Sequence, residues 1–325
     1  MNRPRVSIGV PVYNGQKYIG ATLDSLVAQT YSSIEIIVTD NCSTDATPQI
    51  VQSYAERDPR VKYFRNVSNI GPARNYNASL KAARGEYFKW CSSDDLCAPD
   101  FVEKCVKVLD SDSAVVVAYP RTHIIDADGR VVGRYEYELD FDEPDAYLRF
   151  SRIMNVDHHV HGAHELYGVI RLATLCAAGG MRTHVRGDSV LIARLLLRGR
   201  FRRIEEFLFF NRDHSDRSSR YLARQRVRAG SRLSRYIGCG PLPSAEWWDE
   251  KLRGRIVFPE WRVLSEYARA VHETPRLSLA QQMGCDAAFW AFALRHVPKL
   301  TRDVIIGTEQ FFNHLIDGAR TPLAK

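Results

Sequence analysis

Short apolar runs alternate with longer stretches of helical periodicity through the first third of the chain. The runs 6–12, 34–39, 61–65, 87–91 and 114–119 are rich in valine, isoleucine and aromatic residues, which favour β-strands. Between these runs, apolar side chains recur every three or four residues, as they do on one face of a helix. Strands that alternate with helices predict a mostly parallel sheet with helices on both of its faces.

The rest of the chain is less regular at first and then becomes helical. Helical periodicity begins at about residue 218 and continues to the end of the sequence. The elements and breaks predicted in this half are a turn at Asp128-Gly129, a helix over 188–197, one or two strands over 201–211, and helix breaks at 238–241, Pro275 and Pro298.

Composition and charge narrow the class of protein. Apolar residues make up 45% of the chain and charged residues 26%, as in ordinary globular proteins. No uncharged apolar stretch reaches the roughly 18 residues of a transmembrane helix. No small-residue cleavage site follows the run 6–12, which disfavours a signal peptide. The net charge is +7, and arginines exceed acids over 182–235, which indicates either anionic partners or a solvated basic helix face.

Cysteine and histidine usage gives no clear metal site. The seven cysteines form no C-x-x-C pair, so a disulfide framework or a four-cysteine zinc site is disfavoured and a reducing cytoplasm is expected. His158, His159, His161 and His164 lie close together in the sequence. They are more typical of an exposed surface, or of the lining of a binding pocket, than of a zinc site, because neither cysteines nor a clear helical spacing accompany them.

Acidic residues stand at the carboxyl ends of two predicted strands. Asp40 closes the run 34–39, and Asp94 and Asp95 follow the run 87–91. Ligands of open α/β sheets bind outside the carboxyl ends of the strands, so these carboxylates are expected to converge on one crevice. Paired carboxylates can hold Mg²⁺ or Mn²⁺, and such a metal bridges the phosphates of a leaving diphosphate. Taken singly, an Asp-Asp pair is more often a helix cap or a turn.

Four segments, taken together, resemble the family-2 glycosyltransferases, which are inverting enzymes of the GT-A fold. The similarity continues more weakly to about residue 219. It implies an α/β GT-A domain over 1–217, Rossmann-like with a mostly parallel sheet. A nucleotide-binding half at about 1–110 and an acceptor half at about 111–217 would precede a helical C-terminal extension over 218–325. The matching segments are 6–14, 36–45, 69–75 and 85–95.

The resemblance also implies roles for single residues. Tyr13 would stack on the nucleotide base, Asp40 would bond the base edge, as for uracil or thymine, and Arg74 would lie near the nucleotide. Without the resemblance, Tyr13 is more typical of a core aromatic and Arg74 of a surface helix residue with a buried stem. The acids 94–95 match the last two acids of a D-x-D-D motif that contacts ribose and metal, whereas Ser92 replaces the first. The predicted nucleotide-binding residues are Pro11, Tyr13, Asn14, Asp40, Asn69, Arg74, Ser93 and Asp94, and the predicted metal ligands are Asp94, Asp95 and His214.

The second half supplies a candidate general base and candidate phosphate contacts. Asp188 begins the predicted helix 188–197, where family members carry the acid that removes the proton of the acceptor hydroxyl. The alternative is an ordinary helix N-cap. The segment 211–215 resembles the family segment that closes over the diphosphate. There, Arg212 would pair with phosphate oxygens, and His214 would bind the metal or a phosphate.

These features predict an inverting transferase that uses Mn²⁺ or Mg²⁺ and moves a sugar from a UDP- or dTDP-sugar to an acceptor hydroxyl. The acceptor would be a carbohydrate or a lipid-linked molecule in the synthesis of a cell-surface polysaccharide or glycolipid. We expect a cytoplasmic protein at the inner face of the cell membrane, with no nucleic-acid partner. The C-terminal helices, rich in arginine and tryptophan, would either lie on an anionic membrane or pack as a cap on the rest of the chain.

Two other classes of protein remain open. A nucleotidyltransferase of the same superfamily would share the sheet and the metal chemistry. It typically carries a glycine-rich phosphate loop after the first strand. No such loop follows the run 6–12. A dinucleotide-binding dehydrogenase is disfavoured because the G-x-G-x-x-G pattern is missing there. The second class that remains open is a non-catalytic module that binds sugar nucleotides or an anionic surface.

Overall fold

One sheet of nine strands forms the centre of the molecule. The computed structural model describes residues 3–137, 139–157, 160–215, 242, 246 and 248–320. The strands are β1 Val6–Val12, β2 Ile34–Asp40, β3 Val61–Arg65, β4 Tyr87–Trp90, β5 Leu96–Cys97, β6 Val115–Ile125, β7 Val131–Arg134, β8 Val169–Arg171 and β9 Arg200–Arg212. The helices are α1 Ile19–Val27, α2 Thr47–Arg57, α3 Pro72–Ala82, α4 Phe101–Ser111, α5 Ala146–Met154, α6 Leu172–Ala177, α7 Gly187–Leu196, α10 Pro259–His272 and α11 Leu279–Arg320, with 3₁₀ turns η1 His164–Tyr167 and η3 Glu250–Leu252.

The sheet is mostly parallel, as the sequence predicts. Its strand order is β3-β2-β1-β4-β8-β6-β9-β5, and β7 pairs with β6 outside this path. The first four strands in this order are mutually parallel, and β6 is parallel to β9. The short strand β8 runs antiparallel between β4 and β6. The register sets Val12 of β1 opposite Asp40 of β2, so these two strands end together.

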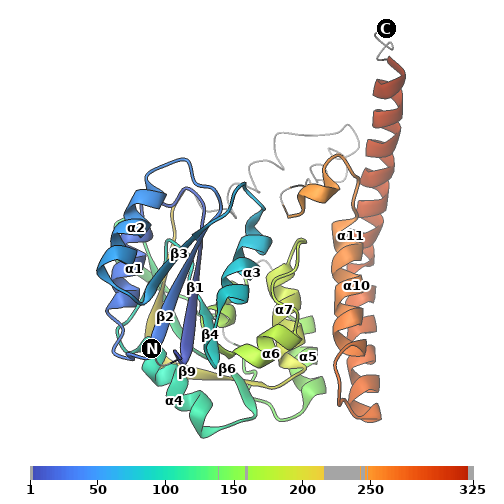
Figure 1. Cartoon of the computed structure of the whole chain (residues 1–325). Helices are drawn as coiled ribbons and strands as arrows, with labels where there is room; N and C mark the ends of the chain where they lie inside the picture. The colour runs from blue at the N-terminus through green and yellow to red at the C-terminus, as the bar shows by residue number, and fades with distance from the viewer. Residues whose placement is uncertain are drawn as a thin grey trace.

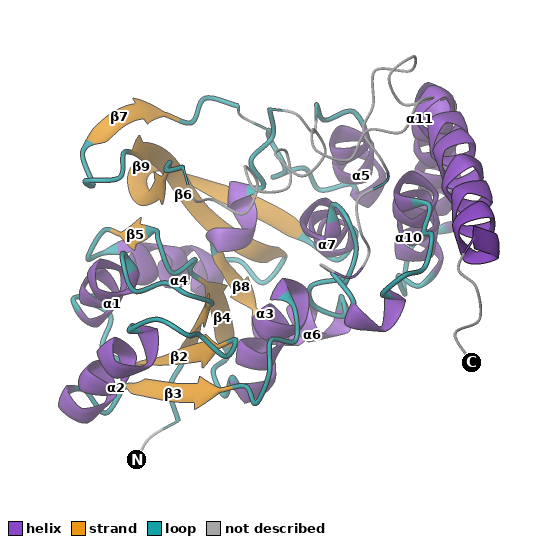
Figure 2. Ribbon diagram, turned by 90° about the horizontal axis from the view of Figure 1, so that it is seen from above, coloured by secondary structure: helices purple, strands orange, loops and turns teal. Residues whose placement is uncertain are grey.

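Helices cover both faces of the sheet, and each face has its own core (Figures 1 and 2). On one face, Ile8 of β1 packs with Leu23 of α1 and Phe101 of α4, all fully buried. On the other face, Trp90 of β4 belongs to the cluster that contains Leu191 of α7. The predicted three-layer arrangement is therefore confirmed.

Helix α3 lies directly on the backbone of β1. A Cβ atom added to Gly9 would stand only 2.4 Å from the Oγ of Ser79, so the helix approaches as closely as a glycine allows. Nearer the start of α3, the Asn75 amide donates to the carbonyl of Val12 at 3.4 Å, which sets this end of the helix, with Arg74, at the carboxyl end of β1. The fold thereby brings a predicted site residue to the edge where the strands end.

The C-terminal helices α10 and α11 stand side by side next to α5 and α7 (Figure 1). Tyr267 of α10 and Phe292 of α11 belong to the same core cluster as Leu191. The end of α10 at His272 agrees with the helix break predicted near Pro275. The predicted boundary at 217/218 and the predicted break at 238–241 lie outside the described residues.

The predicted break at Pro298 is wrong, because Pro298 lies inside α11. Proline removes one helical hydrogen bond and costs about 3 kcal/mol in a helix interior. Packing on both sides of it offsets this cost, since Phe292 and Leu300 are both buried. The indole Nε1 of Trp261 on α10 also donates to the carbonyl of Leu300 at 3.1 Å. Tertiary contacts thus keep α11 helical on both sides of Pro298.

Candidate active site

The loops that follow β1 and β2 are locked to each other. Asn14 has a left-handed backbone (φ 51°), which asparagine tolerates better than most residues. Its N–H donates to the Oγ of Ser43 at 2.8 Å, and its Oδ1 accepts from the N–H of Thr44 at 2.8 Å. The neighbouring Tyr13 keeps 51% of its surface exposed. The tyrosine predicted to stack on a base therefore stands open to solvent on a rigid loop.

Pro11 and Ser93 lie beneath this loop. Pro11 is buried within β1 opposite Thr39 of β2. Ser93 faces the loop from the end of β4, because a Cβ atom on Gly15 would stand 3.4 Å from its Oγ. Neighbouring Ser92, which replaces the usual acid, donates its hydroxyl to the Tyr167 hydroxyl at 3.2 Å.

Asp40 is fully buried at the end of β2. Its Oδ1 accepts the N–H of Ser43 at 2.8 Å, and its Oδ2 accepts the hydroxyl of Tyr63 at 2.7 Å. Arg65 stands 3.6 Å from the same carboxylate. Burial and the nearby Asp40 charge raise the pKa of the Tyr63 hydroxyl above its usual range, so this hydroxyl stays a donor. The carboxylate therefore orders the loop 41–45.

Asparagine side chains join the ends of β1, β2 and β3. Of these asparagines, only Asn69 was predicted to belong to the site. Asn41 donates to the Oδ1 of Asn69 at 2.7 Å, and that oxygen also accepts the N–H of Gly71 at 2.9 Å. Asn75 of α3 donates to the carbonyl of Thr39 at 2.8 Å. The sequence does carry a signal for this network, because four asparagines fall within 35 residues beside strand ends, and asparagine amides pair readily with loop backbone.

Arg74 meets the C-terminal part of the chain. Its Nη2 forms an ion pair with Asp249, just before η3. The two side chains are 31% and 15% exposed. In Figure 1, η3 lies near the start of α3, on the side where β1 ends. The residue predicted to lie near the nucleotide is therefore held by an acid from the C-terminal region.

Asp94 and His214 form a pair at the end of β4. The Nε2 atom of His214 stands 2.9 Å from the Oδ2 atom of Asp94. The Asp94 side chain is 25% exposed and that of His214 is 8% exposed. The ring of Tyr18 lies against His214, with centroids 4.7 Å apart. Two of the three predicted metal ligands thus lie together at the end of β4, although they are 120 positions apart in sequence.

Asp95 is buried and ties the end of β4 to the end of β9. The residue is 1% exposed. Its Oδ1 accepts the backbone N–H of Arg212 at 2.8 Å, and both carboxylate oxygens accept from the Asn211 amide, at 3.1 and 3.3 Å. Its metal role stays a prediction, and these hydrogen bonds fasten it to the end of β9.

Arg212, predicted to contact phosphate, has carbonyl partners in the structure. Its Nε donates to the carbonyl of Asp94 at 2.8 Å, and its Nη1 donates to the carbonyls of Asp126 and Ala127 at 3.0 Å each. The guanidinium also lies 4.7 Å above the ring of Tyr18. Since Arg212 is only 3% exposed, these contacts position the loop that carries Asp94 and His214.

Asp188 lies in the first turn of α7 and is exposed. Its Oδ1 accepts the N–H of Ser189 at 2.7 Å. The residue at the helix N-cap position is Arg186, so the ordinary-cap alternative does not describe Asp188. An exposed carboxylate in the first turn also gains from the helix dipole.

A buried ion pair stands near Asp188. The Nε2 of His161 lies 3.0 Å from the Oε1 of Glu165, and the side chains are 0% and 4% exposed. Burial lowers the pKa of His161, but the hydrogen bond to Glu165 and the charges of Glu165 and Asp188 raise it, and the net shift is upward. Burial raises the pKa of Glu165, yet its bond to His161 makes the net shift downward. Each group therefore favours the charged form of the other.

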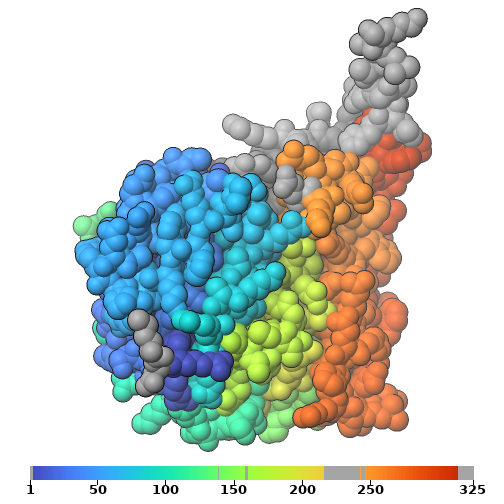
Figure 3. Space-filling view, in the orientation of Figure 1, coloured from blue at the N-terminus to red at the C-terminus, as the bar shows by residue number. Residues whose placement is uncertain are grey.

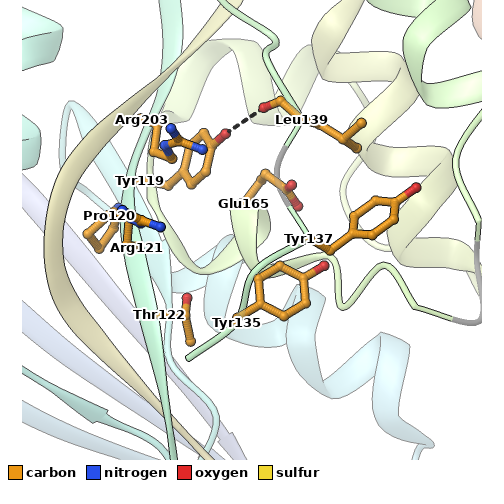
Figure 4. A pocket seen from close by; sticks show the side chains of 9 residues that line it. All are labelled: Tyr119, Pro120, Arg121, Thr122, Tyr135, Tyr137, Leu139, Glu165 and Arg203. Atoms are coloured by element: carbon orange, nitrogen blue, oxygen red, sulfur yellow. Dashed lines mark hydrogen bonds between the residues drawn. The ribbon is translucent and has the colours of Figure 1, made fainter. Parts of the chain in front are cut away.

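Glu165 also lines a small cavity between β6 and the segment 135–139 (Figure 4). The cavity volume is about 20 Å³, enough for roughly one water molecule. The hydroxyl of Tyr119 donates to the carbonyl of Leu139 at its rim, at 3.3 Å. The rings of Tyr135 and His164 meet nearby, with centroids 4.2 Å apart.

Of the predicted histidine cluster, His161 is buried against Glu165 and His164 packs on Tyr135, and neither lines this cavity. His158 and His159 lie outside the described residues. Among the residues that the structure does describe, no three histidine, cysteine or acidic side chains gather as a metal site would require.

Comparison with known proteins identifies the family. The model of glycosyl transferase family 2 matches residues 7–185. An uncharacterized glycosyltransferase of Rickettsia typhi is 38% identical over 150 residues, which cover 46% of this chain and 43% of that protein. The putative glycosyltransferase EpsH of Bacillus subtilis is 38% identical over 117 residues, which cover 36% of this chain and 34% of EpsH. The chain thus spans less than half the length of these relatives.

Solved structures share the fold. S. aureus TarS 1–349 in complex with UDP-GlcNAc superposes with a TM-score of 0.60 at 21% identity, over 90% of this chain and 72% of that one. The mannosyltransferase PcManGT from Pyrobaculum calidifontis, in complex with GDP-Man and Mn²⁺, gives 0.51 at 21% identity, over 95% and 87%. These likenesses confirm the predicted GT-A-like architecture. Since the family model covers more than half of the sequence, the chain belongs to glycosyl transferase family 2.

Proposed function

We propose that the chain is an inverting, metal-dependent glycosyltransferase that moves one sugar from a UDP- or dTDP-sugar to an acceptor hydroxyl. The observation that carries the proposal is the Asp94–His214 pair at the carboxyl edge of a GT-A-like sheet. The solved relatives bind nucleotide sugars, UDP-GlcNAc for TarS and GDP-Man for PcManGT. A crevice in this position is where open α/β sheets bind their ligands.

The side chains at this edge fit a divalent cation. A partly exposed carboxylate and an imidazole nitrogen 2.9 Å apart are a donor set that Mn²⁺ accepts, and diphosphate oxygens and water would complete its coordination. Asp94 and His214 would hold the ion, with Asp95 supporting their loop from below. When bound, the metal would neutralise the charge that develops on the leaving diphosphate.

The nucleotide would lie over the loops that follow β1 and β2. Tyr13 offers an exposed ring for base stacking. Asp40 would act on the base through the loop 41–45, which its carboxylate orders. Arg74 would turn from Asp249 to the nucleotide, since a charged phosphate competes for the same guanidinium. Pro11, Asn14, Asn69 and Ser93 would shape the surface beneath the nucleotide.

Transfer would proceed by direct displacement. The acceptor oxygen attacks the anomeric carbon from the side opposite the diphosphate, and its proton passes to the carboxylate of Asp188. The bond between the anomeric carbon and the diphosphate oxygen breaks, the nucleoside diphosphate leaves, and the configuration inverts. Holding the two substrates in line contributes up to about 7–11 kcal/mol, and the base about 10²–10⁴-fold. We propose a carbohydrate or lipid-linked acceptor, as in the synthesis of cell-surface polysaccharide or glycolipid.

A thermal-shift panel tests the donor and the metal together. The full chain is heated with UDP, dTDP and GDP, each with and without Mn²⁺, and ligands that bind the native state raise the melting temperature. We expect stabilisation by UDP or dTDP that depends on Mn²⁺ and is lost in Asp94→Ala. The matched control Asp128→Ala removes a 71% exposed acid from the turn before β7 and should respond as the wild type does.

Product analysis separates the remaining classes of protein. Release of nucleoside diphosphate with sugar transfer supports the proposal, whereas release of pyrophosphate would assign a nucleotidyltransferase. Binding that weakens steeply with salt, with neither hydrolysis nor transfer, would instead assign a non-catalytic module.

A further inference from the structure

The outer face of α11 exposes large apolar side chains along most of its described length. Trp290, Leu294 and Val297 are 62%, 71% and 48% exposed, and Phe311 and Phe312 are 53% and 57% exposed. Single exposed apolar residues are ordinary, but a continuous row of them marks an interaction surface. Figure 3 shows α10 and α11 as a column along one side of the molecule.

This face is wide and almost free of charge. Between Leu279 and Asn313, Arg295 is the one exposed residue that carries a charge, and the acids of this stretch are buried or half-buried. At 3.6 residues per turn, the uncharged exposed residues span roughly 160° around the helix axis. They are Leu279, Ala280, Met283, Ala287, Trp290, Ala291, Leu294, Val297, Pro298, Thr301, Val304, Ile305, Thr308, Phe311 and Phe312.

Helix α10 continues the apolar face. Trp261 is 47% exposed, and its indole is fixed against α11 by the bond to the Leu300 carbonyl. Phe258 is 39% exposed and lies so close to α11 that a Cβ atom on Gly307 would stand 2.5 Å from its ring. These two rings border an open groove of about 480 Å³ whose other apolar lining residues are Leu252, Ile256 and Val257.

The width of the face favours a lipid surface over a second copy of the chain. A two-helix seam buries only two rows of side chains, here Leu294 with Thr301 and Val297 with Val304. The next rows, with Ile305 and Pro298, would remain in water. A bilayer surface covers all of these rows at once.

Charge points the same way. Arg295 is exposed at the edge of the face and Lys299 is half-buried behind it, and the whole chain carries a net charge of +7. A symmetric contact between identical copies sets the same patch against itself, and the one exposed charged residue of that patch is the base Arg295, because Asp286 and Glu309 are half-buried. Anionic headgroups supply the missing charge, and tryptophan and phenylalanine are typical of the apolar side of helices that lie in a membrane interface.

We propose that the outer face of α11, together with Phe258 and Trp261 at the start of α10, docks on an anionic membrane surface with the helix axis parallel to the bilayer. None of the described helices combines the length and the apolar character needed to cross a bilayer. The contact is therefore peripheral, and it stands independently of the sugar-transfer chemistry.

Vesicle flotation of the full chain tests the proposal. We expect the chain to float with vesicles of an equimolar mixture of phosphatidylcholine and phosphatidylglycerol, and at least tenfold less with phosphatidylcholine alone. The variant Leu294→Glu/Val304→Glu places two charges on the docking face and should bind the mixed vesicles at least tenfold more weakly. Both positions are exposed, 71% and 44%, so the substitutions leave the core untouched.

A control variant and a mass measurement complete the experiment. Val132→Glu changes a 62% exposed apolar residue on β7, away from the face, and should bind vesicles as the wild type does. Absence of flotation with mixed vesicles, or equal flotation of the double variant, would overturn the proposal. A wild-type dimer in light scattering that dissociates in the double variant, without vesicle binding, would assign the face to a second copy instead. Thermal stabilisation by nucleotide should be unchanged in the double variant, which separates this test from that of the sugar-transfer proposal.

Discussion

Two adjacent acids, Asp94 and Asp95, have opposite surroundings. Asp94 is partly exposed beside His214, whereas Asp95 is 1% exposed and accepts hydrogen bonds from the end of β9. We expect Asp95→Asn to lower the free energy of unfolding by about 1–3 kcal/mol, because its amide cannot accept all the donors of Asn211 and Arg212. Asp94→Asn should lower it less, because Asp94 is 25% exposed and the amide oxygen of asparagine can still accept from His214.

Chemical denaturation of both variants without added metal measures the difference. Equal destabilisation would contradict the contrast between a supporting acid and a crevice acid. If Asp95→Asn instead kept full stability but lost stabilisation by UDP and Mn²⁺, then Asp95 would be a metal ligand, as its sequence position predicts.

Asp188 carries the proposed proton transfer. An exposed carboxylate in the first turn of α7 is free to meet an acceptor hydroxyl, and its removal takes away a base without opening the core. We expect Asp188→Asn to reduce the turnover number by about 10²–10⁴-fold, with donor affinity unchanged in isothermal titration. Glu103→Gln, which removes an acid from the first turn of α4, is the matched control and should keep full turnover. Full turnover of Asp188→Asn would exclude it as the base.

At the scale of elements, η1 depends on the charged pair of His161 and Glu165. The pKa of Glu165 is lowered below 4.5, so its stabilising contribution is present above that pH and is lost as pH falls through its folded value. The pKa of His161 is raised above 6.5, so its contribution is present below 6.5 and is lost as pH rises through its folded value. The pair therefore stabilises the fold most between these two values.

Glu165→Gln tests this dependence. We expect the wild type to exceed the variant in free energy of unfolding most strongly between pH 4.5 and 6.5, with the gap narrowing on either side. Denaturant titrations over a series of pH values measure it. Glu205→Gln, at a 66% exposed acid of β9, should show no such window. A gap independent of pH would mean that Glu165 acts through shape alone.

The sequence predicted the strands and helices that are long enough to show a pattern of apolar residues. Strands such as Val6–Val12 are buried along their whole length, which gives the continuous apolar runs that were detected. Strands β5 and β8 have only two and three residues, too few to show a period, and they exist because longer strands pair with them. Pro298 has a local preference that distant packing overrides.

The sequence predicted where the candidate site lies on the sheet, but not which side chains are exposed there. The edge of the sheet follows from the order of strands and helices, so acids at strand ends were expected there. Which of Asp94 and Asp95 is buried depends on Asn211 and Arg212, more than 110 positions later. The pairing of Arg74 with Asp249 depends on a contact 175 positions away. Such contacts leave no periodic trace in a single sequence.

For the whole molecule, the helices beyond residue 258 are part of the main core. Tyr267 is fully buried, and Phe289 is 8% exposed, in the cluster that also holds Leu191 of α7 and Phe150 of α5. Arg194 of α7 is buried and pairs with Glu266 of α10 at 3.3 Å. Shared core residues couple the stability of the helices to that of the sheet.

We therefore expect the chain to unfold in one cooperative transition. Phe289→Ala should lower the free energy of unfolding by about 3–5 kcal/mol, because it leaves a cavity between α11 and the core. Far-ultraviolet circular dichroism follows all helices, and tyrosine and tryptophan absorbance follows the packed aromatics, so both should report the same shifted midpoint. Trp290→Ala, at a 62% exposed ring on the same helix, should shift the midpoint far less. Two separate transitions, with Phe289→Ala affecting only one, would show that α10 and α11 fold as an independent unit.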